Sequence, residues 1–126
     1  MAKILIIEDE SAIRRVLTKI LVEESKEYEV EEAADGVEGV EKLKKEDYDL
    51  VLCDIKMPKM DGMEVLAEVK KLKPEIPFVM ISGHGDLETA VNAMRLGAYD
   101  YISKPPDLNR LLSPPLQADS ISLLPA

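Results

Sequence analysis

The stretch LVLCDIKMPKMDG, residues 50–62, begins with four apolar residues and then reaches a carboxylate at Asp54. Four consecutive apolar residues are typical of a strand buried on both faces of a sheet, and the Pro, Met, Asp and Gly that follow are typical of a loop. An Asp at the end of such a strand either caps the next turn or holds a charge at the rim of the sheet. Residues elsewhere in the chain decide between these two roles.

The composition fits one domain that does not bind nucleic acid. The chain has 126 residues, 46% of them hydrophobic, which is enough for one core. The chain contains 16 Lys and Arg residues and 25 Asp and Glu residues. The resulting net charge of −9 repels nucleic acid and anionic lipid. The single cysteine, Cys53, lies in an apolar run, which favours core packing in a reducing compartment. No apolar stretch approaches the ~18–20 residues of a membrane span, and the acidic N-terminus does not fit a signal peptide, so we expect a soluble cytoplasmic protein.

Short apolar or β-branched runs alternate along the chain with amphipathic stretches. The apolar runs predict five strands, at residues 3–7, 28–33, 50–53, 78–81 and 99–103. The amphipathic stretches predict four helices, at residues 11–23, 36–46, 63–72 and 87–96. Ser11 is the expected N-cap of the first helix, and Gly97 is the expected residue just beyond the fourth.

The connections between the predicted strands are long enough to hold helices, which indicates parallel strands with right-handed crossovers. The first, third and fourth strands are apolar throughout, as in a sheet covered on both faces. The sequence therefore predicts an α/β fold, a doubly wound parallel sheet with helices on both faces. Ligands of such folds bind beyond the carboxyl ends of the strands, where Asp54 lies.

Polar residues follow four of the predicted strands and should gather at that edge. Glu8 and Asp9 follow the first strand, Asp54 the third, Ser82 the fourth and Lys104 the fifth. Three close carboxylates with no His or Cys among them favour Mg²⁺. An ammonium group and a hydroxyl donor are what a phosphoryl group requires.

Each of these residues alone also has an ordinary structural explanation. Asp54 fits a turn cap, Glu8 and Asp9 fit the cap of the following helix, and Ser82 and Lys104 fit loop or surface residues. Their coincidence at four strand ends favours a common site. The single histidine, at position 84, has no second His or Cys to complete a metal site and is interpreted as a loop residue.

Four motifs in order resemble the receiver domain (CheY-like) of bacterial response regulators: EDE (8–10), DIKMPKMDG (54–62), ISGHGD (81–86) and GAYDYISKP (97–105). The stretch from Ser82 to Pro105 is similar to the nitrogen-regulation (NtrC-like) type, whose receivers control an ATPase that activates an alternative sigma factor. The resemblance extends from residue 3 to about 112. It implies a flavodoxin-like, five-stranded sheet of order 2-1-3-4-5 and a receiver domain over residues 1–112.

The resemblance also implies roles for the metal and phosphoacceptor residues. Asp54 would be the phosphoacceptor that attacks a phosphohistidine of a sensor histidine kinase. Asp9 and Asp54 would bind Mg²⁺ directly, together with the backbone carbonyl of Lys56, and Glu8 would act through bound water.

Further residues would bind the phosphoryl group and respond to it. Lys104 and the backbone N–H groups of Lys56 and Gly83 would contact its oxygens. Ser82 would move toward it, and Tyr101 would follow from an outward to an inward rotamer.

Three more expectations come from the same stretches. The Lys104–Pro105 bond would be a cis peptide. Lys56 and His84 would flank the path of water to the phosphoryl group and slow its loss. The resemblance also implies that the first helix docks the kinase together with the loop at Pro105, through outward side chains of the helix, namely Arg14, Arg15 and Thr18.

An alternative function is that of aspartate-nucleophile phosphatases, which resemble a D-x-D-x-T pattern. The second Asp of that pattern is Lys56 here, and lysine cannot serve as a carboxylate acid. A receiver that has lost its chemistry and only binds a partner would lack Asp9, Asp54 or Lys104, all of which are present. The sequence therefore predicts a switch and not an enzyme with an external substrate.

The end of the chain departs from the family. Residues 107–112 allow two helical turns before Pro114 and Pro115, so the fifth helix would be truncated. Residues 113–126 form an atypical Pro, Ser and Leu tail, either non-native or able to cover apolar surface and promote a homodimer. The NtrC-like stretch favours a fragment of a longer regulator, with output domains for transcription regulation absent from this chain.

Overall fold

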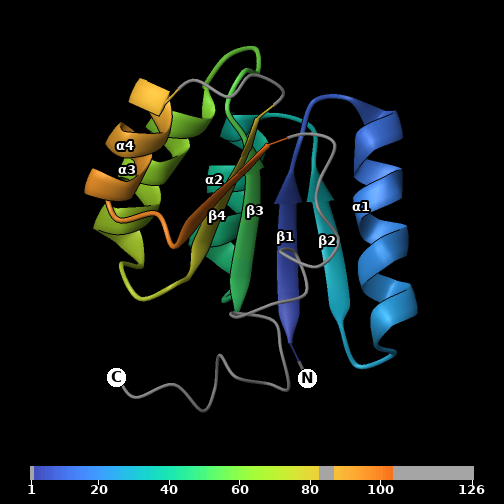
Figure 1. The fold of residues 1–126 in the computed structure, drawn as a ribbon. Helices are drawn as coiled ribbons and strands as arrows, with labels where there is room; N and C mark the ends of the chain where they lie inside the picture. The colour runs from blue at the N-terminus through green and yellow to red at the C-terminus, as the bar shows by residue number, and fades with distance from the viewer. Residues whose placement is uncertain (1, 83–86, 104–126) are drawn as a thin grey trace.

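The computed structural model describes residues 2–82 and 87–103 of the chain. Five parallel strands form one sheet in the order β2-β1-β3-β4-β5 (Figure 1). The strands are β1 (Lys3–Ile7), β2 (Glu29–Ala33), β3 (Leu50–Asp54), β4 (Phe78–Ser82) and β5 (Asp100–Ser103). The helices between them are α1 (Ser11–Glu24), α2 (Gly36–Lys45), α3 (Gly62–Leu72) and α4 (Leu87–Arg95). The predicted class and strand order are confirmed, and every described element begins and ends within one residue of its predicted range.

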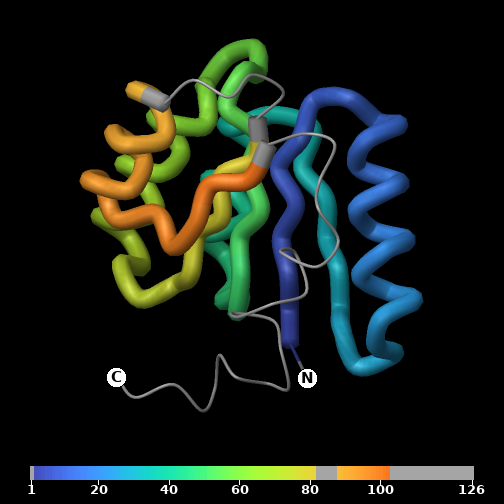
Figure 2. Tube along the Cα trace, viewed as in Figure 1, coloured from blue at the N-terminus to red at the C-terminus, as the bar shows by residue number. Residues whose placement is uncertain are grey.

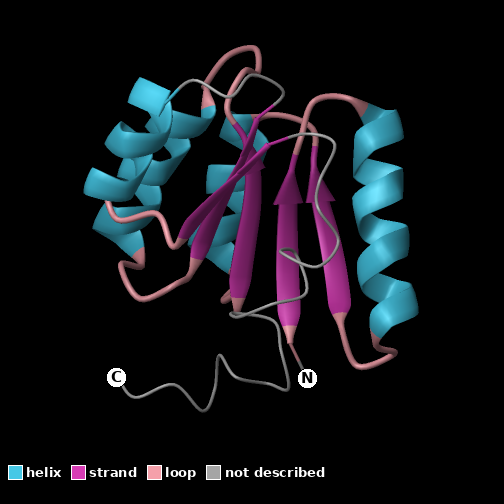
Figure 3. Cartoon of the chain, in the orientation of Figure 1, coloured by secondary structure: helices cyan, strands magenta, loops and turns pink. Residues whose placement is uncertain are grey.

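The sheet carries a hydrophobic core on each face because successive residues of a strand point to opposite sides. Leu5 and Ile7 of β1 pack with buried residues of α2, α3 and α4. Ile4 and Ile6 pack instead with Leu17 of α1 on the other face. Figure 3 shows α1 separated by the sheet from the other helices. Helices on both faces, as predicted for a doubly wound sheet, are thus confirmed.

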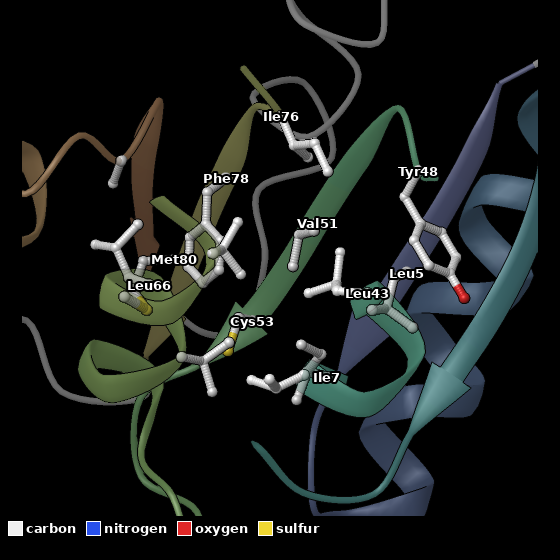
Figure 4. Packing of buried hydrophobic residues seen from close by; sticks show 14 of the residues in the cluster. Leu5, Ile7, Leu43, Tyr48, Val51, Cys53, Leu66, Ile76, Phe78 and Met80 are labelled. Atoms are coloured by element: carbon white, nitrogen blue, oxygen red, sulfur yellow. The ribbon is translucent and has the colours of Figure 1, made fainter. Parts of the chain in front are cut away.

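Cys53 is fully buried in the cluster between the sheet and the helices α2 and α3 (Figure 4). Burial raises the pKa of its thiol well above the ordinary value, and the nearby carboxylates of Asp54 and Glu8 add to this effect. The thiol therefore stays protonated and unreactive. The prediction that Cys53 serves core packing is confirmed.

The helix ends confirm one predicted boundary residue and correct another. Gly97 has a φ of 105°, and backbone bonds from Gly97 N–H to the Met94 carbonyl and from Ala98 N–H to the Ala93 carbonyl close α4 as predicted. Ser11 was the expected N-cap of α1, and this is wrong, because Ser11 is already helical. Glu10 occupies the N-cap, and its side chain makes no cap hydrogen bond.

Several predictions concern residues outside the described part of the chain. The short helix at 107–112, the tail at 113–126 and the domain boundary between them belong to this group. The truncated fifth helix therefore stays a prediction.

Candidate functional site

The predicted site lies at the carboxyl ends of the strands, where the loops after β1 and β3 run along the top of the view in Figure 2. Strand register brings the two central carboxylates to neighbouring positions. Ile7 of β1 pairs with Cys53 of β3 in the parallel register. The residues that follow them, Glu8 and Asp54, therefore lie at neighbouring positions. Their exposed fractions are 2% and 6%, and among the described residues they are the buried charged side chains. Two buried carboxylates at adjacent strand ends create a strongly negative site.

Three consecutive carboxylates gather after β1. Oxygens of Glu8, Asp9 and Glu10 all lie within 4.8 Å of one another. Asp9 and Glu10 are exposed, so the cluster opens to solvent, whereas Glu8 forms its buried side. The donor set consists of oxygen atoms alone, which fits a hard divalent cation such as Mg²⁺. Glu10 was not among the predicted ligands, although the EDE motif contains it.

Glu8 is fixed by hydrogen bonds in three directions. Its N–H donates to the Ala33 carbonyl of β2 (3.1 Å), and its carboxylate accepts from the Glu10 N–H (3.1 Å). Its carbonyl accepts from Nη1 of Arg14 (2.7 Å). The buried carboxylate therefore has a defined position before any ligand binds.

Two of the three side chains expected to face a kinase turn toward the sheet instead. Nε of Arg14 donates to Oε1 of Glu32 in β2 (3.0 Å), and Oγ1 of Thr18 donates to Oε2 of the same carboxylate (3.1 Å). Only 18% of the Arg14 side chain is exposed. The outward orientation predicted for Arg14 and Thr18 is wrong because Glu32 attracts both, whereas Arg15 is exposed as predicted.

The loop that follows Asp54 leads into α3 and is tied back to the end of β3. Asp61, not Asp54, caps α3, in a capping box with Glu64 in which each side chain accepts from the other's backbone N–H (2.9 and 3.2 Å). Gly62 N–H donates to the Ile55 carbonyl (2.7 Å), which closes the loop. A Cβ on Gly62 would collide with the Asp54 carbonyl. The N-cap of the following helix thus comes from Asp61.

The structure places the remaining predicted residues as far as it describes them. Lys56 is exposed, two residues beyond Asp54. Tyr101 is half-buried and packs against the cluster that contains Cys53, opposite Met80 in the β4–β5 register. Ser82 ends β4. Outside the described residues lie the Ser82 side chain, Gly83, His84, Lys104 and Pro105, so their predicted roles, including the cis peptide, stay predictions.

Sequence reasoning missed three residues that shape the site. The capping box of Asp61 and Glu64 could have been predicted from the sequence, because Asp and Glu three residues apart before an apolar run are typical of a helix start. Glu10 had only the signal of an adjacent acidic pair. The closeness of Gly62 to the Asp54 carbonyl had none, because it depends on how the loop closes.

Among residues 2–82 and 87–103, no helix is both long enough and apolar enough to cross a membrane.

Comparison with known proteins shows one family throughout. The family model described as response regulator receiver domain matches residues 4–114. The transcriptional regulatory protein ZraR of Klebsiella oxytoca is 38% identical over 108 residues, which are 86% of this chain and 24% of that protein. The DNA-binding transcriptional regulator NtrC of Proteus hauseri is 37% identical over 108 residues, 86% of this chain and 22% of that protein.

A solved structure shows the same fold. The receiver domain of NtrX from Brucella abortus superposes with a TM-score of 0.83 at 40% identity, covering 97% of this chain and 99% of that chain. The chain spans about a quarter of the length of the curated relatives it matches. The family model, the relatives and the solved structure all indicate a receiver domain, and the superposition supports the fold. The chain therefore belongs to the response regulator receiver domain family.

Proposed function

We propose that this domain is the phosphoacceptor switch of a two-component system and that Asp54 receives the phosphoryl group. The observation that carries this proposal is the position of Asp54, buried at the carboxyl end of β3 beside Glu8. A carboxylate in that position is a nucleophile at the rim of the sheet.

The transfer has a simple balance. An Asp54 carboxylate oxygen attacks the phosphorus atom of a phosphohistidine, and the P–N bond breaks as the P–O bond forms. The imidazole, which already carries a proton on its other nitrogen, leaves as the neutral ring with the electron pair of the P–N bond. The cluster of Glu8, Asp9 and Glu10 provides oxygens that would hold Mg²⁺, together with Asp54 and the Lys56 carbonyl. When bound, Mg²⁺ supplies neutralisation of charge on the phosphoryl oxygens.

Further residues, some of them outside the described part of the chain, complete the proposal. Lys104 and the N–H groups of Lys56 and Gly83 bind phosphoryl oxygens, and Ser82 and Tyr101 carry the signal from the site. The half-buried position of Tyr101 supports this, because its ring packs against the core cluster that contains Cys53 and can pass a change at the site to that cluster.

The partners follow from the family. We propose a sensor histidine kinase as phosphodonor and output domains beyond this chain, a sigma-factor-activating ATPase and a DNA-binding domain. The relatives ZraR and NtrC, named as transcriptional regulators, support this. The free thiol of Cys53 supports a cytoplasmic location. The domain itself turns over no external substrate, and dimerisation through residues 113–126 stays a prediction.

The proposal is tested by intact mass after incubation with acetyl phosphate, in Mg²⁺ or in EDTA. We expect one phosphoryl adduct in Mg²⁺ and none in EDTA. The adduct should be removed by hydroxylamine because an acyl phosphate is attacked by this nucleophile. An adduct that forms without a divalent cation, or that resists hydroxylamine as a phosphoserine does, would contradict the proposal.

A second expected result concerns the lifetime of the phosphorylated state. Long side chains at positions 56 and 84 obstruct the approach of water, so Lys56→Asn and His84→Glu are expected to speed the loss of the phosphoryl group. Lys59→Asn is the matched control, since Lys59 is an exposed lysine of the same loop that pairs with Asp35. Decay rates are measured by the adduct mass over time after removal of acetyl phosphate. Equal rates in all four proteins would exclude a role for these side chains in water access.

A further inference from the structure

One guanidinium group connects three elements at the acidic cluster. Arg14 extends from the first turns of α1 and donates from Nη1 to the Glu8 carbonyl at 2.7 Å. Its Nε donates to Oε1 of Glu32 at 3.0 Å, and Glu32 lies in β2 one residue before its end. Thr18 holds the second oxygen of Glu32 from the next turn of α1 (3.1 Å). The guanidinium is thus fixed at one end and directed at Glu8 by the other.

Arg14 contacts the acidic cluster at its main chain, through the Glu8 carbonyl. Two of the three hydrogen bonds that fix Glu8 have backbone partners. The Glu8 N–H donates to the Ala33 carbonyl of the neighbouring strand, and the Glu8 carboxylate accepts from the Glu10 N–H in the turn. The third acts on the Glu8 carbonyl, which belongs to the peptide plane shared with Asp9. The orientation of this plane sets the direction in which Asp9 and Glu10 leave the strand. A bond to this carbonyl therefore helps to position Asp9 and Glu10, and the Glu10 N–H in turn holds the Glu8 carboxylate.

We infer that Arg14 is a positioning residue of the metal site and that it acts by holding the Glu8 carbonyl from an anchor on Glu32. This inference rests on the proposed function, because it takes the cluster of Glu8, Asp9 and Glu10 to bind Mg²⁺. Groups that orient metal ligands through hydrogen bonds commonly change metal affinity by 10-fold or more when they are removed.

The charge of Arg14 alone predicts a change in Mg²⁺ affinity of the opposite sign. The Arg14 guanidinium lies beside a negative cluster and repels an incoming cation, so its removal should tighten Mg²⁺ binding if it acts only through its field. Removal should weaken binding if Arg14 positions the ligands. The direction of the change separates the two accounts.

Arg15 provides the matched control. It carries the same charge on the next residue of α1 but is exposed, since adjacent residues of a helix point about 100° apart. Arg15→Gln and Arg14→Gln therefore remove the same charge from the same helix. Only the second removes the bonds to Glu8 and Glu32.

Lysine at position 14 separates charge from geometry. Arg14→Lys keeps the positive charge, but one ammonium group lacks the rigid fork that reaches the Glu8 carbonyl and Glu32 at the same time. The field account predicts unchanged Mg²⁺ affinity for this variant. The positioning account predicts a loss close to that of Arg14→Gln.

The experiment is an Mg²⁺ titration of the whole chain, followed by amide chemical shifts, for wild type, Arg14→Gln, Arg14→Lys, Arg15→Gln and the double variant Arg14→Gln/Glu32→Gln. We expect about 10-fold weaker binding for both single variants of Arg14. Arg15→Gln should bind as tightly as wild type or more tightly. In the double variant the lost charges cancel, so a field effect returns the affinity to the wild-type value, whereas lost positioning leaves it weak.

Two further readings exclude a general loss of structure. Thermal unfolding without metal shows that each variant is folded at the titration temperature, and Arg14→Lys serves if Arg14→Gln is not folded. Excess Mg²⁺ should restore phosphorylation by acetyl phosphate in the Arg14 variants, because only the occupancy of the site is reduced. Arg14→Gln or Arg14→Lys binding Mg²⁺ as tightly as Arg15→Gln would overturn the inference while leaving the proposed function intact. No Mg²⁺ binding by wild type would overturn both.

Discussion

Asp54→Asn is expected to acquire no phosphoryl group from acetyl phosphate in Mg²⁺, while its thermal midpoint stays close to that of wild type. The amide has nearly the volume of the carboxylate, so the buried position beside Glu8 is filled without a cavity. It lacks the negative oxygen that attacks phosphorus, and chemistry at this position stops. Removal of one of two neighbouring buried negative charges also reduces their repulsion, so folding is not impaired.

Asp61→Asn is the control for this prediction. It changes an Asp of the same loop to the same amide, and Asn is as good an N-cap as Asp, so α3 keeps its start. Intact mass should show the adduct in Asp61→Asn at the wild-type level. An adduct of wild-type yield on Asp54→Asn would place the phosphoacceptor at another residue.

The fold was predictable because its signals are local. Each central strand is an apolar run, each helix has an amphipathic period, and the turn between α4 and β5 depends on one residue, Gly97, whose positive φ favours glycine. Because the carboxyl ends of parallel strands lie at one edge of the sheet, the sequence also predicts that Glu8 and Asp54 lie close together. Strand register confirmed that they are neighbours.

The errors arose where a distant residue decides the outcome. Arg14 and Thr18 lie on the polar side of the α1 pattern, and nothing within the helix shows that Glu32 of β2 accepts hydrogen bonds from both. Ser11 has a side chain that favours the N-cap, but the N-cap is Glu10, one residue earlier, whose carbonyl accepts from the Arg14 N–H (3.0 Å). Both cases involve the turn after β1, whose course depends on contacts with β2.

The loop after β3 gives the prediction with the largest expected loss of stability. Gly62→Ala is expected to lower the free energy of unfolding by roughly 3 kcal/mol, at the upper end for inserting a methyl group into a packed site. The new Cβ would collide with the Asp54 carbonyl and lie 2.8 Å from the Ile55 Cα, and both neighbours are backbone atoms that cannot rotate away. Gly62 is the first residue of α3, so the advantage of about 1 kcal/mol that Ala has over Gly in helix interiors applies only in part and offsets little of the loss.

Gly39→Ala separates this backbone collision from the general effect of the substitution. Gly39 lies inside α2, and the nearest atoms to its Cβ would belong to the side chain of the buried Ile7. That crowding also costs stability, but a side chain can shift slightly within the core, whereas the Asp54 carbonyl is part of the main chain. We expect Gly62→Ala to melt roughly 10 °C below wild type and Gly39→Ala to lose less. Phosphorylation should separate them further, because moving the Asp54 carbonyl also moves the nucleophile, whereas Ile7 is on the apolar side of β1. A Gly62→Ala protein as stable and as readily phosphorylated as wild type would show that the loop can shift without moving Asp54, and the rigid placement of this carboxylate would then have to come from the strand alone.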